Sequence, residues 1–149
     1  MGLFQSFDIC ASGMTAQRLR MDTIADNIAN INTTRTEDGG PYTRKVVTFT
    51  EKTLGSSSFA DILDKKQAYL GDGVKVSRIY EDTSTDYIME YDPSHPEADE
   101  NGYVTYPNVN TVTEMTNLID SSRAYEANVT AFEAVKSMAQ TGITAGGNS

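Results

Sequence analysis

Two apolar stripes with helical spacing, one at each end of the chain, limit most strongly what this sequence can fold into. In the C-terminal stretch the steps alternate between three and four residues, which places the members on one helix face. Thr111 and Glu114 match the S/T-x-x-E capping box that marks a helix start. We therefore expect one long helix over residues 109–140, followed by a flexible tail over 141–149. The stripe consists of Met115, Leu118, Ser122, Tyr125, Val129, Phe132 and Ala139.

The N-terminal stretch repeats this spacing and predicts a second long helix over residues 1–32. A narrow stripe cannot form the core of a globule, so each helix needs a partner. The two helices could pair within one chain, with the seam as core, or pack mainly against other copies. Polar Gln17, Ser122 and Lys136 on the seams favour a register-setting role in the second arrangement. The N-terminal seam consists of Phe7, Cys10, Met14, Gln17, Met21, Ile24, Ile28 and Ile31.

Residues 33–108 between the helices predict a small β-rich module with loops. Alternating β-branched and aromatic residues predict strands over 42–50, 74–80 and 87–91, and a short extended piece over 102–106. A glycine–serine patch over 54–58 precedes a short predicted helix over 59–69. The predicted fold class is α+β, with long N- and C-terminal amphipathic helices packing as a coiled-coil-like pair or tube around this module.

Composition excludes several classes of function. The net charge is −9, and the acidic run from Glu81 to Asn101 contains no Lys or Arg. Such a surface repels phosphate, so we expect no nucleic-acid partner. The single Cys10 excludes an internal disulfide and a cysteine-based zinc site. We also expect no membrane-spanning segment and no cleaved signal peptide, because no apolar run is long enough and the start lacks a basic region.

The sequence offers little catalytic chemistry. Its only histidine, His95, lies between two prolines in a loop, where nothing marks a nucleophile beside it. We therefore expect no catalytic residues, no cofactor, no metal and no small-molecule substrate. The alternative is a metal- or His95-dependent enzyme that uses the acidic run, which loss of swimming with normal assembly in His95→Ala would favour.

Several blocks resemble known proteins. The segment Ile24–Thr33 resembles the N-terminal signature of the flagellar axial proteins of the rod and hook. Further blocks are similar to a subunit of the proximal basal-body rod, and the resemblance covers Ser6 to about Met138. The alternative within the same class is another rod- or hook-related subunit. The further blocks are Thr33–Thr36, Gly39–Tyr42, Tyr91–Pro96, Gly102–Val104, Pro107–Asn110 and Ser122–Asn128.

This resemblance implies a non-enzymatic protein that leaves the cell through the flagellar type III export apparatus. Its copies would stack helically with other rod proteins into a hollow, torque-transmitting shaft within the cell envelope or periplasm. Asparagines near the helix ends either cap and turn the chain or bridge subunits. The predicted subunit-interface residues are Phe7, Met14, Met21, Ile24, Asn27, Ile28, Asn30, Asn108, Asn110, Met115, Leu118, Tyr125, Val129 and Phe132.

Overall fold

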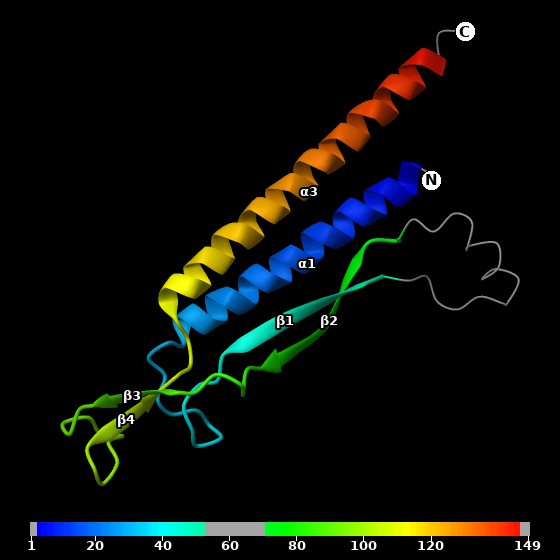
Figure 1. The fold of residues 1–149 in the computed structure, drawn as a ribbon. Helices are drawn as coiled ribbons and strands as arrows, with labels where there is room; N and C mark the ends of the chain where they lie inside the picture. The colour runs from blue at the N-terminus through cyan, green and yellow to red at the C-terminus, as the bar shows by residue number, and fades with distance from the viewer. Residues whose placement is uncertain (1–2, 53–70, 147–149) are drawn as a thin grey trace, which may run out of the picture. The chain divides into compact units, whose positions relative to one another are not determined.

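The computed structural model describes residues 3–52 and 71–146 and confirms a long helix near each end with short strands between (Figure 1). The glycine–serine patch and the helix predicted over 59–69 lie outside the described residues. The predicted fold class, α+β, is confirmed. The elements are α1 (Leu3–Ala29), β1 (Lys45–Glu51), β2 (Val74–Glu81), β3 (Ile88–Tyr91), β4 (Tyr103–Tyr106) and α3 (Thr111–Gly146).

The chain divides into two compact units, each made of several separate stretches of sequence. Both units take part of each helix and part of the β1–β2 pair. The first unit comprises Met1–Arg18, Phe49–Ser77 and Ser122–Ser149, and the second comprises Leu19–Thr48 and Arg78–Ser121.

The strands form two separate two-stranded sheets, β1 with β2 and β3 with β4. In the second sheet the strands are antiparallel, with Ile88 opposite Tyr106 and Tyr91 opposite Tyr103. The first strand begins three residues later than predicted, at Lys45. The reason is that the Tyr42 N–H bonds the Thr33 carbonyl instead of a neighbouring strand.

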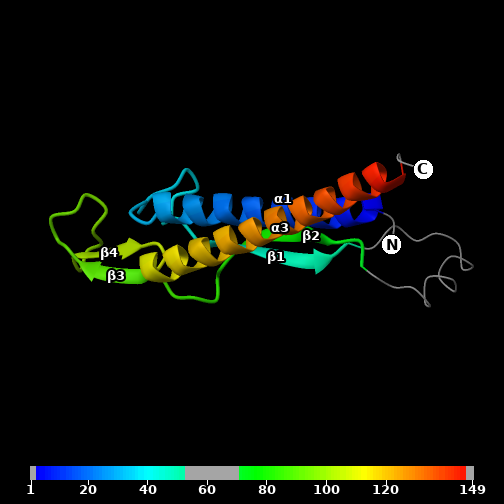
Figure 2. The ribbon, with the colours of Figure 1, turned by 90° about the horizontal axis from the view of Figure 1, so that it is seen from above.

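In the first unit the segments of α1 and α3 are neighbours, side by side in Figure 1 and one in front of the other in Figure 2. The rings of Phe7 and Phe132 meet edge to face with centroids 4.9 Å apart. Gly13 leaves no room for a side chain, since a Cβ there would lie 2.5 Å from Oδ1 of Asn128. Ala16 is also buried. Small residues on α1 therefore bring the helix backbones close together.

Burial along α3 follows a line that differs from the predicted stripe. Glu114 and Ser121 are buried, whereas Met115, which the apolar spacing placed on the inward stripe, is 54% exposed. Leu118 and Tyr125 belong to both lines and are half-buried. The inward line therefore contains polar residues one position before the predicted apolar ones, and part of the apolar stripe faces outward.

The end of α3 also differs from the prediction. The helix continues to Gly146, so residues 141–146 belong to it and not to a flexible tail. A glycine inside a helix costs only about 1 kcal/mol relative to alanine, so Gly142 does not stop it. The hydroxyls of Thr141 and Thr144 donate to the carbonyls of Ser137 and Gln140, which keeps their side chains engaged within the helix.

Gly73 allows the start of β2 to approach α1. The Ser12 hydroxyl accepts a hydrogen bond from the Val74 N–H at 3.1 Å. Gly73 has a φ of +102°, and a Cβ there would collide with the Ser12 hydroxyl and lie 3.3 Å from Cα of Ile9. We expect Gly73→Ala to lower the free energy of unfolding by about 1–3 kcal/mol, because it adds backbone strain to this collision.

Urea denaturation followed by circular dichroism measures this loss. The matched control is Gly40→Ala, because a Cβ at Gly40 has open space around it. The control should stay within about 0.5 kcal/mol of the wild-type protein. Equal stability of the Gly73 and Gly40 variants would contradict the role given to Gly73.

Candidate functional site

A buried acid in the second unit organises the most extensive polar contacts in the described part of the chain. Glu114 lies in the first turn of α3 and is only 1% exposed. Its Oε1 accepts hydrogen bonds from Nη2 and Nε of Arg44, at 2.7 and 2.9 Å. Its Oε2 accepts one from Nδ2 of Asn27 at 3.0 Å. A buried carboxylate requires such partners, since an unpaired charge in the interior is costly.

Arg44 links this acid to a second one. The guanidinium Nη1 lies 3.3 Å from Oδ2 of Asp82, just after β2. Burial is the largest single influence on the pKa of Arg44 and lowers it, but the hydrogen bonds and negative charges of Glu114 and then Asp82 together outweigh burial and raise the pKa. Hydrogen bonds from Ser84, then Thr85, lower the pKa of Asp82 to about 2. The lowered pKa of Asp82 and the raised pKa of Arg44 thus fit an ionised pair.

The side chain of Asn27, at the C-terminal end of α1, bonds the backbone N–H and carbonyl of Lys45, as a neighbouring strand would. Its Oδ1 accepts the Lys45 N–H at 2.8 Å, and its Nδ2 donates to the Lys45 carbonyl at 2.9 Å. Tyr42 also donates its hydroxyl to Oδ1 at 2.9 Å. Burial, then the charge of Asp26, raise the pKa of Tyr42, so the phenol remains a neutral donor. The end of α1 is therefore bonded directly to the start of β1.

Asn108 makes an equivalent connection before α3. Its Oδ1 accepts the Arg44 N–H at 2.8 Å. Its Nδ2 donates to the carbonyls of Asp82 and Thr85, at 2.7 and 3.0 Å. The side chain is buried. We call Asn27, Arg44, Asp82, Asn108 and Glu114 the polar network. It connects α1, β1, the turn after β2 and the start of α3 within the second unit.

The capping box predicted from Thr111 and Glu114 is wrong. The cap is Asn110, whose Oδ1 accepts the Thr113 N–H at 3.1 Å. Glu114 turns across to Arg44 instead of back to the helix start. The physical reason is that the half-buried guanidinium of Arg44 offers the carboxylate a stronger, charge-assisted partner than a backbone N–H does.

Comparison with known proteins finds relatives that match nearly the whole length of the chain. A family profile described as flagella basal body rod protein matches residues 7–35. A profile described as the C-terminal part of flagellar basal body rod FlgEFG proteins matches residues 100–145. The flagellar basal-body rod protein FlgC of Borreliella burgdorferi is 44% identical, over 96% of this chain and 97% of the relative.

Two further relatives have the same name. The Bacillus subtilis protein is 43% identical over 98% of this chain and 99% of its own. The Salmonella typhimurium protein is 36% identical over the same shares of the two chains. The chain belongs to the FlgC family of flagellar basal-body rod proteins. It is thus a structural protein of the rod, and the resemblance drawn from its sequence blocks is confirmed.

The segments that match the rod profiles contain three members of the polar network, Asn27, Asn108 and Glu114. The other two, Arg44 and Asp82, lie between these segments. Sequence reasoning singled out the asparagines but assigned Glu114 to a cap and gave Arg44 no role. The sequence shows only that Glu114 lies one position before the apolar Met115. The structure shows that this position is on the inward side of the helix.

The predicted interface residues occupy different environments in this FlgC-family chain. Asn27 and Asn108 belong to the polar network, Asn110 caps α3, and Asn30 bonds Asp26 within its own turn. Ile24 is buried, and Phe7 contacts Phe132. Met115 is exposed. Their role between subunits stays a prediction. The remaining members, Met14, Met21, Ile28, Leu118, Tyr125 and Val129, are half-buried.

The histidine considered for chemistry lies in the segment between β3 and β4. The Nδ1 of His95 accepts the Glu97 N–H at 3.1 Å, within its own turn. Residues 3–52 and 71–146 bring no group of three or more metal-ligating side chains together. In the same ranges, no helix has the length and apolar character needed to cross a bilayer.

Proposed function

We propose that the protein is a subunit of the proximal rod that stacks helically with other copies of itself and with other rod proteins. It reaches this position through the flagellar type III export apparatus without a cleaved signal peptide. It works within the cell envelope, in the periplasm where there is one, and has no catalytic role. Relatives that are rod proteins along nearly their whole length support this proposal.

The polar network is the observation that carries the mechanical part of the proposal. A subunit of a rotating shaft must transmit load without its elements sliding past one another. In the second unit, the pair of Glu114 and Arg44 joins α3 to the residue just before β1. Asn27 joins α1 to Glu114 and to Lys45 at the start of β1. Separating α3 from Arg44 would leave the buried charge of Glu114 unpaired, which costs about 3–5 kcal/mol, and displacing α1 would remove the Asn27 amide from that charge. Such contacts resist sliding more strongly than non-directional apolar packing.

A deletion strain tests the proposed function. The gene is removed from its own bacterium and restored with an epitope-tagged copy, and basal bodies are isolated and labelled with gold. We expect restored swimming and gold on the rod, close to the membrane. His95→Ala should swim normally. Restored swimming without labelled rods, or a tagged protein confined to the cytosol, would contradict the proposal.

Val129 tests the predicted seam in the same strain. We expect Val129→Asp to block rod growth, because burying a side chain of this size contributes about 1.5–3 kcal/mol, whereas burying an unpaired carboxylate is unfavourable. The isolated variant should remain soluble and helical, since Val129 is only half-buried within the chain. Val129→Ala is the control and should assemble. Normal swimming of Val129→Asp would show that the seam is placed wrongly.

A further inference from the structure

The start of α3 presents an apolar face that nothing in the described chain covers. Val112, Met115 and Ile119 are 74%, 54% and 55% exposed. Their spacing of three and four residues places them on one side of the helix. Exposed apolar side chains grouped in this way mark interaction surfaces more often than scattered ones do.

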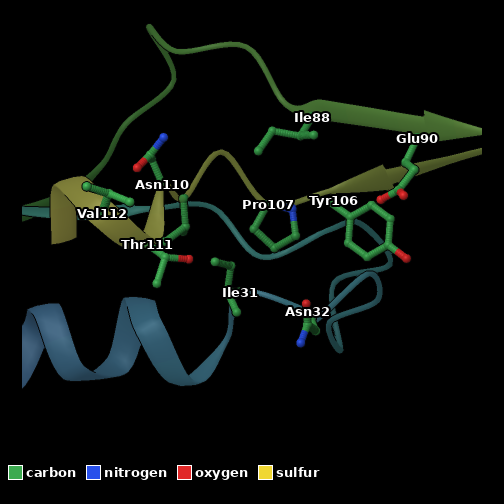
Figure 3. A pocket seen from close by; sticks show the side chains of 10 residues that line it. Ile31, Asn32, Ile88, Glu90, Tyr106, Pro107, Asn110, Thr111 and Val112 are labelled. Atoms are coloured by element: carbon green, nitrogen blue, oxygen red, sulfur yellow. The ribbon is translucent and has the colours of Figure 1, made fainter. Parts of the chain in front are cut away.

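This face continues into a groove within the second unit. The groove has a volume of about 430 Å³. Figure 3 shows Ile88 on β3 opposite Ile31 after α1, with Val112 at one end of the groove and Glu90 at the other. Ile88 is itself 50% exposed. The α3 docking face is defined by the residues Ile31, Ile88, Val112, Met115 and Ile119.

The surroundings of the α3 docking face are acidic and short of positive charge. Among the described residues that line the groove, Glu90 is the only charged one, and Asp120 follows Ile119 on α3. Neither carboxylate has a hydrogen bond or ion pair to any described residue. The second unit contains fourteen of the 21 acidic residues but five of the twelve basic ones, so it carries the whole net charge of −9.

Those five basic side chains are already engaged within the chain. Arg44 bonds Glu114 and Asp82, Arg35 bonds Glu97, and Lys45 bonds Asp26. Arg78 lies over the ring of Tyr80, and Arg20 also has an internal partner. The same face of a second copy would therefore bring like charge and no free cation, which opposes symmetric pairing. The fitting occupant is an amphipathic helix that carries a basic residue.

The first unit of the same chain provides such a helix. Its acidic and basic residues balance, at seven each. Near the end of α3, Lys136 is exposed and has no partner among the described residues, and Ile143 is 75% exposed. Seven residues separate the two, so they lie on the same side of the helix. This segment combines an exposed apolar side chain with a free positive charge.

We propose that the α3 docking face of one copy binds the Lys136–Ile143 segment of α3 of a second copy, head to tail. The inference rests on the proposed function, because a contact between two different surfaces leaves a free face at each end. Such a contact can therefore continue as a helical stack, whereas a symmetric pair cannot.

Site-specific cross-linking tests this contact. A photoreactive amino acid replaces Met115, and equal amounts of ¹⁴N- and ¹⁵N-labelled protein are mixed and irradiated. Mass spectrometry then identifies cross-links that join two copies. We expect them to map to residues 136–146 of the other copy. Cross-links between two Val112–Ile119 segments, or no cross-links between copies, would overturn the proposal.

Charge variants sharpen the test. Lys136→Glu should lower the yield of this cross-link about fivefold, because it replaces an attraction by a repulsion. Lys136→Arg should retain the yield, and Lys75→Glu, a charge reversal on exposed β2, should leave it unchanged. Equal loss in the two Glu variants would overturn the specific role of Lys136.

Basal bodies isolated from the strain that carries the photoreactive residue separate this inference from the proposed function. Incorporation into the rod with cross-links that map only to another rod protein overturns the inference and leaves the proposed function standing. Absence of the unmodified protein from basal bodies overturns the proposed function itself.

Discussion

Replacing Glu114 with alanine is expected to lower the free energy of unfolding by about 3 kcal/mol. The variant leaves Arg44 without its main partner, and breaking a buried ion pair typically costs about 3–5 kcal/mol. The lower end of this range applies because the Arg44 side chain is 23% exposed and keeps Asp82 as a second partner. Urea denaturation of the purified protein measures the change.

Asp120→Ala provides the matched control, because Asp120 lies on the same helix but is exposed. It should change stability by no more than about 0.5 kcal/mol. The double variant Arg44→Met/Glu114→Leu should be more stable than Glu114→Ala, since it removes both charges together. A Glu114→Ala variant as stable as the Asp120 control would show that the ion pair does not support the fold.

Local patterns were sufficient to predict the helices and most strand positions. The three-and-four spacing of apolar residues identified α1 and α3, and alternation with turn residues identified β1 to β4 within a few residues. These signals are local, because each depends on residues that are close in the sequence. The same locality explains the misplaced end of α3, where a single glycine outweighed the helical residues around it.

The polar network could not be predicted because its contacts join distant parts of the sequence. Glu114 bonds Arg44 across 70 residues and Asn27 across 87. Thr111 and Glu114 have the spacing of a capping box. Only the position of Arg44 in the folded chain decides whether Glu114 caps the helix or forms an ion pair. The family resemblance drew attention to Asn27 and Asn108, but it did not say what their amides contact.

The inward line of α3 shows the same limit. Apolarity favoured Met115, whereas the structure buries Glu114 and Ser121. A polar side chain can be buried when hydrogen-bond partners surround it, and the spacing of apolar residues in the sequence does not show where those partners lie. The difference matters for assembly, because it leaves Met115 on the exposed side of the helix, where another subunit can reach it.

Asn27→Ala is expected to destabilise the protein by about 2–4 kcal/mol. The variant removes four hydrogen bonds at once and leaves both backbone groups of Lys45 without their side-chain partner. Each buried group left without a partner costs about 1–3 kcal/mol. The control is Asn30→Ala, because the Asn30 amide bonds only side-chain and backbone groups close in sequence, those of Asp26 and Thr33. That variant should stay within about 0.5 kcal/mol of the wild-type protein.

Amide hydrogen exchange gives a local measure of the same contact. The Lys45 N–H is protected by Oδ1 of Asn27, so its exchange should accelerate by at least about tenfold in Asn27→Ala. Asn27→Asp keeps an acceptor for this N–H but places a second carboxylate against Glu114. Like charges disfavour ionisation, so this variant should be destabilised more at pH 7 than at pH 4. An unchanged Lys45 exchange rate in Asn27→Ala would mean that the end of α1 is not held to β1 by this side chain.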